Sequence, residues 1–159
     1  MIGRMARGAL AGAVATWLMD QVTTAMMSAQ KGEVTAREEA VQPNGKGALE
    51  NLIDRLESAS GIPLSDAQRS MTLQALHYGL GMGPGALYAV VRHRIPLIGA
   101  GGGLLFGAGL WAANDELLNT ALGLAAPFGD YPMATHIRGL VGHLALGGAT
   151  DSILDLLGG

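Results

Sequence analysis

Apolar stretches alternate with one strongly polar stretch along this chain. Four segments have the length and apolar character of membrane spans, which need about 20 mostly apolar residues. They lie at about residues 6–29, 71–91, 95–121 and 134–157. The two middle segments are the clearest, because residues 70–91 and 95–114 contain no aspartate, glutamate, lysine or arginine. The pattern therefore predicts four membrane-spanning helices.

The polar stretch, at about residues 31–70, separates the first two predicted spans and is too charged to enter lipid. Part of it has the i, i+3, i+4, i+7 spacing of an amphipathic helix, at Leu49, Leu52, Ile53 and Leu56. Gly61 and Pro63 should end that helix, and Ser65 with Gln68 has the spacing of a capping box that starts the next one. We expect this additional helix at the membrane interface or on the helical bundle.

Composition supports the same fold class. The 159 residues are 49% hydrophobic and only 14% charged, and they include 25 glycines. A glycine inside a water-exposed helix costs about 1 kcal/mol relative to alanine, whereas membrane helices use glycine for close packing. We therefore expect one domain, residues 1–159, with an all-α fold: a polytopic membrane bundle of four spanning helices and one amphipathic interfacial helix in the first loop.

Several function classes are not expected. The net charge of -3 and the lack of a basic stripe argue against nucleic acid as a partner. The chain has no cysteine, which excludes disulfides and thiolate chemistry. Asp115 and Glu116 are adjacent and point about 100 degrees apart on an α-helix, so they should not form a catalytic pair. We expect no enzyme activity, and we expect the two acids near the outer interface, opposite Arg138.

The distribution of basic residues predicts an orientation. Arg4, Arg7, Arg92 and Arg94 all lie on one side if the chain crosses four times, whereas the short loop around Asp130 has no lysine or arginine. Basic residues in short flanks favour the cytoplasmic side. Both termini are therefore expected in the cytoplasm, with the polar loop outside.

Small residues recur on the predicted helix faces. In the third segment, glycines are spaced four residues apart, the small-xxx-small pattern of close helix packing. The glycines expected at helix contacts are Gly12, Gly81, Gly99, Gly103, Gly107 and Gly147. We expect these faces to let helices approach closely.

Polar residues inside the apolar segments form the candidate site. On the last segment, histidines and an aspartate share one stripe of about 120 degrees, while Arg138 points away and should reach the headgroups. Polar groups at membrane depth are expected to face the bundle interior, because exposure to lipid costs several kcal/mol. The candidate residues are Asp20, His77, Asn114, His136, His143 and Asp151. Asp20 is expected to pair with His77 or His143.

Three interpretations of these polar residues stay open. They form a structural hydrogen-bonded network, or they line a path for protons, ions or small solutes, since imidazoles titrate near neutral pH. Alternatively, His77 and His143 on different helices bind a haem as axial ligands. His136 and His143 are two helical turns apart, about 10 Å, so they should not bind one ion together. No resident metal or cofactor is expected, and haem is the alternative.

The expected function is that of a membrane assembly component. Glycine-lined faces on several helices, together with the surface helix, offer more docking area than four helices need among themselves. We expect a lipid bilayer as environment, and a homo-oligomer or a subunit of a larger membrane complex with structural, accessory or interaction roles. Transport is the alternative function.

The second half of the chain, about residues 71–157, contains the turn RHRIP, the sequence AAP and the sequence GHL in the last segment. With these motifs it resembles the YagU-like family of small bacterial inner-membrane proteins of unknown function. Residues 6–20, ARGALAGAVATWLMD, resemble the family's first helix more loosely. The resemblance implies the bacterial inner membrane as location and supplies no catalytic residues.

Overall fold

The computed structural model describes residues 1–158, which form helices and turns without a strand among them. The predicted all-α fold is thereby confirmed. In chain order the elements are α1 (Ile2–Ser28), α2 (Gly32–Val41), η1 (Pro43–Gly45), α3 (Ala48–Ser60), α4 (Asp66–Val91), α5 (Leu104–Leu110), η2 (Trp111–Leu118), α6 (Asn119–Ala121), η3 (Phe128–Asp130) and α7 (Met133–Leu156). The element η2 is a π-helix that continues α5 directly.

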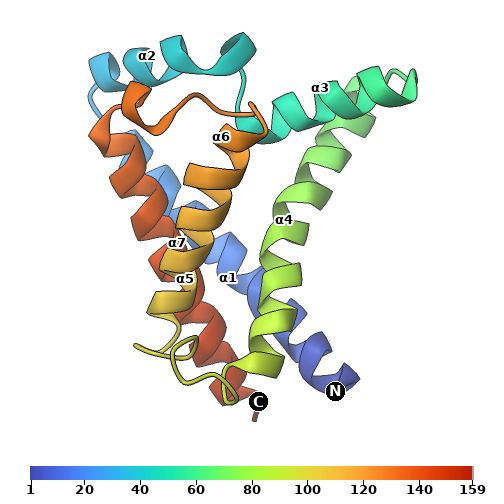
Figure 1. Cartoon of the computed structure of the whole chain (residues 1–159), viewed down its shortest axis with the longest axis vertical. Coiled ribbons are helices and arrows are strands. Elements are labelled where there is room, and N and C mark those ends of the chain that lie inside the picture. Colours follow the sequence, from blue (N-terminus) through green and yellow to red (C-terminus); the bar gives the residue numbers. More distant parts are fainter. Residues whose placement is uncertain (159) are drawn as a thin grey trace.

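The long helices run up and down in a bundle whose two chain ends lie together at one end (Figure 1). α4 packs mainly on α1, α1 also packs on α7, and α7 packs on α5. The third column of the bundle consists of α5, η2 and α6. α2 and α3 cover the end of the bundle opposite the termini (Figure 1). This arrangement of four helical columns agrees with the predicted order of segments.

The first loop is more helical than the sequence pattern indicates. α3 ends at Gly61, whose φ of 68° is the left-handed conformation that glycine adopts readily. Ser65 and Gln68 form the predicted capping box at the start of α4. α2 was not predicted, because its ten residues include Glu38 and lack an apolar stripe. Glu38 is nevertheless buried.

The third column begins later than predicted. Residues 95–103, expected inside a helix from residue 95, form turns, and α5 starts at Leu104. Gly101, Gly102 and Gly103 have φ values of 68°, 62° and 84°. A right-handed helix requires negative φ, so three successive left-handed residues end any helix there. The same glycines that suggested close packing thus also form the turn.

Placement in a membrane is a separate question from helical architecture. α1, α4 and α7 have 27, 26 and 24 residues, enough in length for a hydrocarbon core of about 30 Å. Within residues 1–158, however, no helix combines sufficient length with sufficient apolar character to span a membrane. The helical bundle is established, and its position in a bilayer stays a prediction.

α1 and α4 cross where glycines from both helices meet. A Cβ atom at Gly12 would overlap the carbonyl oxygen of Gly81, and a Cβ at Gly81 would overlap the hydroxyl of Thr16. Gly8 and Gly85, which the packing prediction omitted, face each other one step further along the same crossing. Only glycine lets the two backbones approach this closely.

α5 and α7 cross in the same way. A Cβ at Gly103 or Gly147 would overlap the carbonyl oxygen of the other, and a Cβ at Gly107 would overlap that of His143. Gly99 differs from the prediction because it lies in the turn before α5, where a Cβ would lie 3.0 Å from the carbonyl oxygen of Arg92. Gly99 and Gly103 therefore both lie in the turn before α5, and Gly103 packs that turn on α7, whereas Gly12, Gly81, Gly107 and Gly147 pack helices.

Candidate functional site

A half-open cleft of about 490 Å³ lies between α4 and η2. α4 contributes His77, η2 contributes Asn114 and Asp115, and α7 contributes His143. The cleft exists because α4 packs on α1 while α5 packs on α7, which leaves these two walls apart. Three predicted site residues, His77, Asn114 and His143, therefore line one cavity.

Asp20 on α1 pairs with His77 on α4. Its Oδ1 lies 2.9 Å from Nε2 of the histidine. The side chains are 33% and 29% exposed, respectively, so both remain open to protons and solvent. Of the two histidines predicted as partners of Asp20, the structure selects His77. The carboxylate holds one ring nitrogen and thereby sets the orientation of the imidazole at the cleft wall.

His143 is oriented by its own helix. Its Nδ1 lies 3.0 Å from the carbonyl oxygen of Gly139 and 3.5 Å from Oδ2 of Asp115. A carbonyl oxygen only accepts hydrogen bonds, so Nδ1 carries the hydrogen. Asn114 donates from Nδ2 to Oδ1 of Asp115 at 2.9 Å. Asp115 is thus held by an amide and approached by an imidazole.

His136 lies outside the cleft in a closed pocket of its own. Its ring is 6% exposed and stacks on Phe128, with ring centroids 3.8 Å apart. Nε2 donates to the carbonyl oxygen of Phe128 at 3.0 Å, and Nδ1 lies 2.7 Å from Oε1 of Glu116. A carbonyl oxygen only accepts hydrogen bonds, so Nε2 is a donor, and Nδ1 faces the Glu116 carboxylate. Both ring nitrogens are occupied, which fits a structural role.

Asp151 belongs to a third location, near the chain termini. It accepts hydrogen bonds from the Tyr88 hydroxyl at 2.7 Å and from Nη1 of Arg92 at 2.6 Å. Nη2 of Arg92 lies 2.8 Å from Asp155. We call these four residues the terminal network. The Arg92 side chain is only 3% exposed. The predicted site is therefore divided among three places: the cleft, the pocket of His136 and the terminal network.

Asp115 and Glu116 each face a histidine of α7, His143 and His136 respectively. Both acids also line a second pocket together with Arg138, the residue opposite which they were expected. Their position at the outer interface stays a prediction. The sequence did contain an indication of these two residues. Like Asp20, they are acids within a mostly apolar segment. The π-helix that carries them is a rare geometry, often found at functional sites. Asp115 is the site residue that sequence reasoning missed.

Arg138 also differs from the prediction. Instead of pointing outward, its guanidinium donates to Gln30 at 2.7 Å and forms an ion pair with Glu38 of α2. Both partners of this ion pair are nearly buried. A buried carboxylate needs a paired cation, and Arg138 of α7 is that cation for Glu38 of α2. The sequence of α2, which lacks an apolar stripe, contained no such information.

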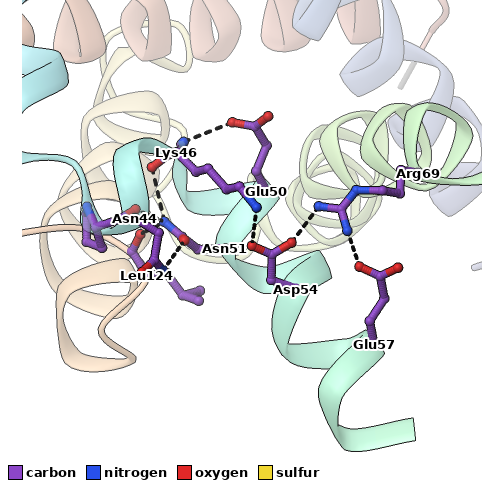
Figure 2. Close-up of polar contacts among 10 residues, drawn as sticks. Asn44, Lys46, Glu50, Asn51, Asp54, Glu57, Arg69 and Leu124 are labelled. Carbon is purple, nitrogen blue, oxygen red and sulfur yellow. Dashed lines mark hydrogen bonds and ion pairs between the residues drawn. The ribbon is translucent and has the colours of Figure 1, made fainter. Parts of the chain in front are cut away.

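The first turn of α3 forms the roof of the cleft, through Gly47, Ala48, Leu49 and Glu50. Asn51 attaches the roof to the rest of the bundle, because its Nδ2 lies 3.1 Å from the carbonyl oxygen of Leu124, and Asn44 donates to its Oδ1 at 3.0 Å (Figure 2). Arg55 of α3 donates to the carbonyl oxygens of Leu122 and Gly123. These bonds join α3 to the end of the third column.

The same helix is attached to α4 by ion pairs. Arg69 contacts Asp54 at 2.5 Å and also Glu57, while Lys46 contacts Asp54 at 2.6 Å (Figure 2). The hydrogen bonds from Lys46 and Arg69 hold the pKa of Asp54 below its usual range. The hydrogen bond to Asp54 likewise raises the pKa of Arg69. The predicted amphipathic helix is thus held over the cleft from two sides, with Ile53 fully buried.

The site offers little for a metal ion. Within residues 1–158, no group of three or more histidine, aspartate or glutamate side chains is placed to hold one. His77 and His143 share the cleft, but Nε2 of His77 is held by Asp20. The haem alternative stays a prediction. The geometry does place two imidazoles, each beside a carboxylate, around an apolar cavity.

Comparison of this chain with family models, with curated proteins and with solved structures gives no match. These comparisons do not bear on the resemblance to the YagU-like family, which stays a prediction. Functional inference therefore depends on the geometry of the bundle and its cleft.

Proposed function

We propose that this protein is a multi-pass component of the bacterial inner membrane that acts as an accessory or interaction subunit and not as an enzyme. The observation that carries the proposal is the outward-facing apolar surface of the long helices. The exposed residues include Leu10, Val14, Trp17, Leu80, Leu87, Leu104, Leu105, Leu117, Ile137 and Val141. They belong to α1, α4, α7 and the third column.

This apolar surface favours burial in lipid or against protein. Soluble monomers rarely expose contiguous apolar patches larger than a few hundred Å². The fully buried side chains are few, with Tyr88, Ile53 and Leu154 the largest apolar ones. A bundle with a small interior and an apolar exterior suits a bilayer, where lipid covers the outer faces.

The charge distribution is compatible with an orientation. Arg4, Arg7, Arg92 and Arg94 belong to the end that carries both termini, and α2 with α3 lies at the other end (Figure 1). By the excess of basic residues in short flanks, the end with the termini belongs in the cytoplasm. The resemblance to the YagU-like family implies the inner membrane as location.

Cysteine labelling tests the membrane placement. The chain has no cysteine of its own, so each introduced cysteine is the only reactive thiol. Leu87→Cys is at an exposed apolar position of α4, and Ala67→Cys is at an exposed position near the start of the same helix. In intact membranes, a water-soluble maleimide should label Ala67→Cys and not Leu87→Cys. Equal labelling of both would reject the proposal of a bilayer around this helix.

Mass measurement tests the assembly role. The chain has a mass of 16.3 kDa. After gentle detergent extraction, a homo-oligomer or a complex with another membrane protein is expected by light scattering and mass spectrometry. A monomer that copurifies with no other protein contradicts the assembly role and leaves the labelling result unaffected.

A second candidate function is proton-linked movement of a small solute or ion. It is favoured by one observation, the two imidazoles beside carboxylates around the cleft, His77 with Asp20 and His143 with Asp115. Liposomes that contain the protein and a trapped pH-sensitive dye test it. Asp20→Asn and His143→Gln should each slow proton flux. Absence of flux in the native protein, or unchanged flux in both variants, rejects this candidate.

A further inference from the structure

The cleft between α4 and η2 is acidic and apolar at the same time. Its carboxylates are Asp115 on one wall and Glu50 in the roof. Among the described residues, 1–158, no lysine or arginine lines it, and its basic groups are the imidazoles of His77 and His143. Apolar side chains make up much of the remaining wall: Met19, Leu73, Leu80, Pro84, Leu110 and Leu146.

Asp115 differs in its partners from Asp151 and Glu38. Asp151 is bound by the guanidinium of Arg92, and Glu38 by that of Arg138. Asp115 instead accepts a hydrogen bond from the neutral amide of Asn114 and has the imidazole of His143 at 3.5 Å. Asp151 and Glu38 are thus matched by fixed cations, whereas Asp115, like Glu116 beside His136, has an imidazole as its basic partner.

We propose that the cleft binds a small amphipathic organic cation. Its positive charge lies beside Asp115, and its apolar body lies against the leucines of α4 and α5. The volume of about 490 Å³ falls within the range of roughly 300–1,000 Å³ of small-molecule sites. A charge of one sign in a partly desolvated cavity attracts the opposite charge more strongly than it does in water. An anionic group such as a phosphate is repelled by the same carboxylates.

The inference goes beyond the proposed membrane role and does not depend on it. It concerns equilibrium binding in the cleft, whether or not the protein assembles with others or moves the bound cation. The side walls come mainly from α4 and η2, with residues of α1 and α7 between them, and the roof comes from α3, so the cleft is formed within one chain.

Two probes of equal shape and opposite charge distinguish recognition of the positive charge from nonspecific apolar binding in the cleft. Tetraphenylphosphonium is a lipophilic cation, and tetraphenylborate is its anionic counterpart. Equilibrium dialysis of each, against the detergent-purified full chain and against empty micelles as a blank, measures specific binding. We expect saturable binding of the cation at one site per chain, and no saturable binding of the anion. Equal binding of both probes would overturn the proposal.

Substitutions locate the site. Asp115→Asn keeps the side-chain volume and removes the charge, and it should weaken cation binding about tenfold, as expected for one lost charge pair at intermediate dielectric. Asp130→Asn makes the same change at an exposed aspartate outside the cleft and should leave the affinity unchanged. Equal affinity of Asp115→Asn and the native chain would overturn the assignment of the charge partner.

A second variant covers the case in which Asp115→Asn does not fold, which circular dichroism and size-exclusion chromatography will show. Glu50→Gln changes a residue of the roof and should weaken cation binding about threefold, because the charge of Glu50 is more exposed and better screened than that of Asp115.

Mass spectrometry of the purified protein provides the last check. A copurified lipid that the phosphonium does not displace would identify the cleft as a lipid site and overturn the proposal.

Discussion

The cleft and the terminal network contain the same kinds of residues and differ in what neutralises the carboxylates. In the terminal network, Asp151 is bound by Arg92, which is 3% exposed, and by the hydroxyl of Tyr88. At the cleft, Asp115 has an amide and an imidazole as partners, and Asp20 has an imidazole. A guanidinium carries a fixed charge and closes the ion pair of the terminal network. The carboxylates at the cleft are matched by an amide and by imidazoles and have no such fixed cation.

The largest effect should follow from breaking the terminal network. Arg92→Met leaves Asp151 as a buried carboxylate without its guanidinium, and removing one partner of a buried ion pair costs about 3–5 kcal/mol. Arg94→Met alters an exposed arginine two residues away and should change the free energy of unfolding by less than about 0.5 kcal/mol. Thermal unfolding of both variants in detergent measures the difference. Similar stability of the two variants would show that the network is not the structural anchor we describe.

The next effect concerns the helix crossing behind the cleft. Gly107→Ala places a Cβ against the carbonyl oxygen of His143, and such overpacking costs about 1–3 kcal/mol. Gly109→Ala, on the same helix, has no atom within 4 Å of the added Cβ. It should be neutral or stabilise the helix by up to about 1 kcal/mol. Urea unfolding of the pair tests the crossing, and loss of stability in Gly109→Ala would count against the observed packing.

A smaller effect is expected from the Asp20 and His77 pair. Both side chains are about one third exposed, and ion pairs of this kind contribute about 1 kcal/mol or less. Asp20→Asn retains a hydrogen-bond acceptor for the imidazole. The free energy of unfolding should therefore change little, even if proton flux or ligand binding changes. A loss of several kcal/mol in this variant would place the cleft in the same structural class as the terminal network.

The smallest effect concerns acid and the roof helix α3. The pKa of Asp54 is lowered, first by Lys46 and then by Arg69, so the charged carboxylate favours the folded state. This contribution is present above the unfolded value of about 3.8 and is lost as the pH falls through the lower folded value. The difference in melting temperature between the native chain and Asp54→Asn should therefore shrink below about pH 3.8. Asp130→Asn is the control, and a difference that persists in strong acid contradicts the ion-pair explanation.

Local patterns predicted much of the helical framework. The capping box at Ser65 and Gln68, the ending at Gly61 and the apolar periodicity correspond to observed helix boundaries. The interior stripe of the last segment was also predicted, and Thr150 and His136 are indeed buried. Gly101 to Gly103 show the limit of such patterns. The same glycines suit helix packing and left-handed turns, and the surroundings decide between them.

The candidate site was less predictable because its partners are far apart in sequence. Asp20 had two possible histidine partners, and Asp115 was dismissed on the assumption of α-helical geometry. The π-helix η2 changes the direction of the side chains it carries, which single-residue propensity does not foresee. α2 was also not predictable from its own sequence, because it has no apolar stripe. The ion pair between its buried Glu38 and the distant Arg138 explains its position.

What the amino-acid sequence by itself determined is the all-α class and the order of the helical columns, which depend on local periodicity. It also indicated Gly12, Gly81, Gly107 and Gly147 as contact glycines, whereas Gly8 and Gly85 became evident only from the crossing of α1 and α4. Only the tertiary structure decided that Asp20 joins His77, that Asp115 borders a cleft and that Asp151 is closed by Arg92. Those outcomes depend on where α4 separates from the third column and where the helices converge, which is set by packing among distant segments.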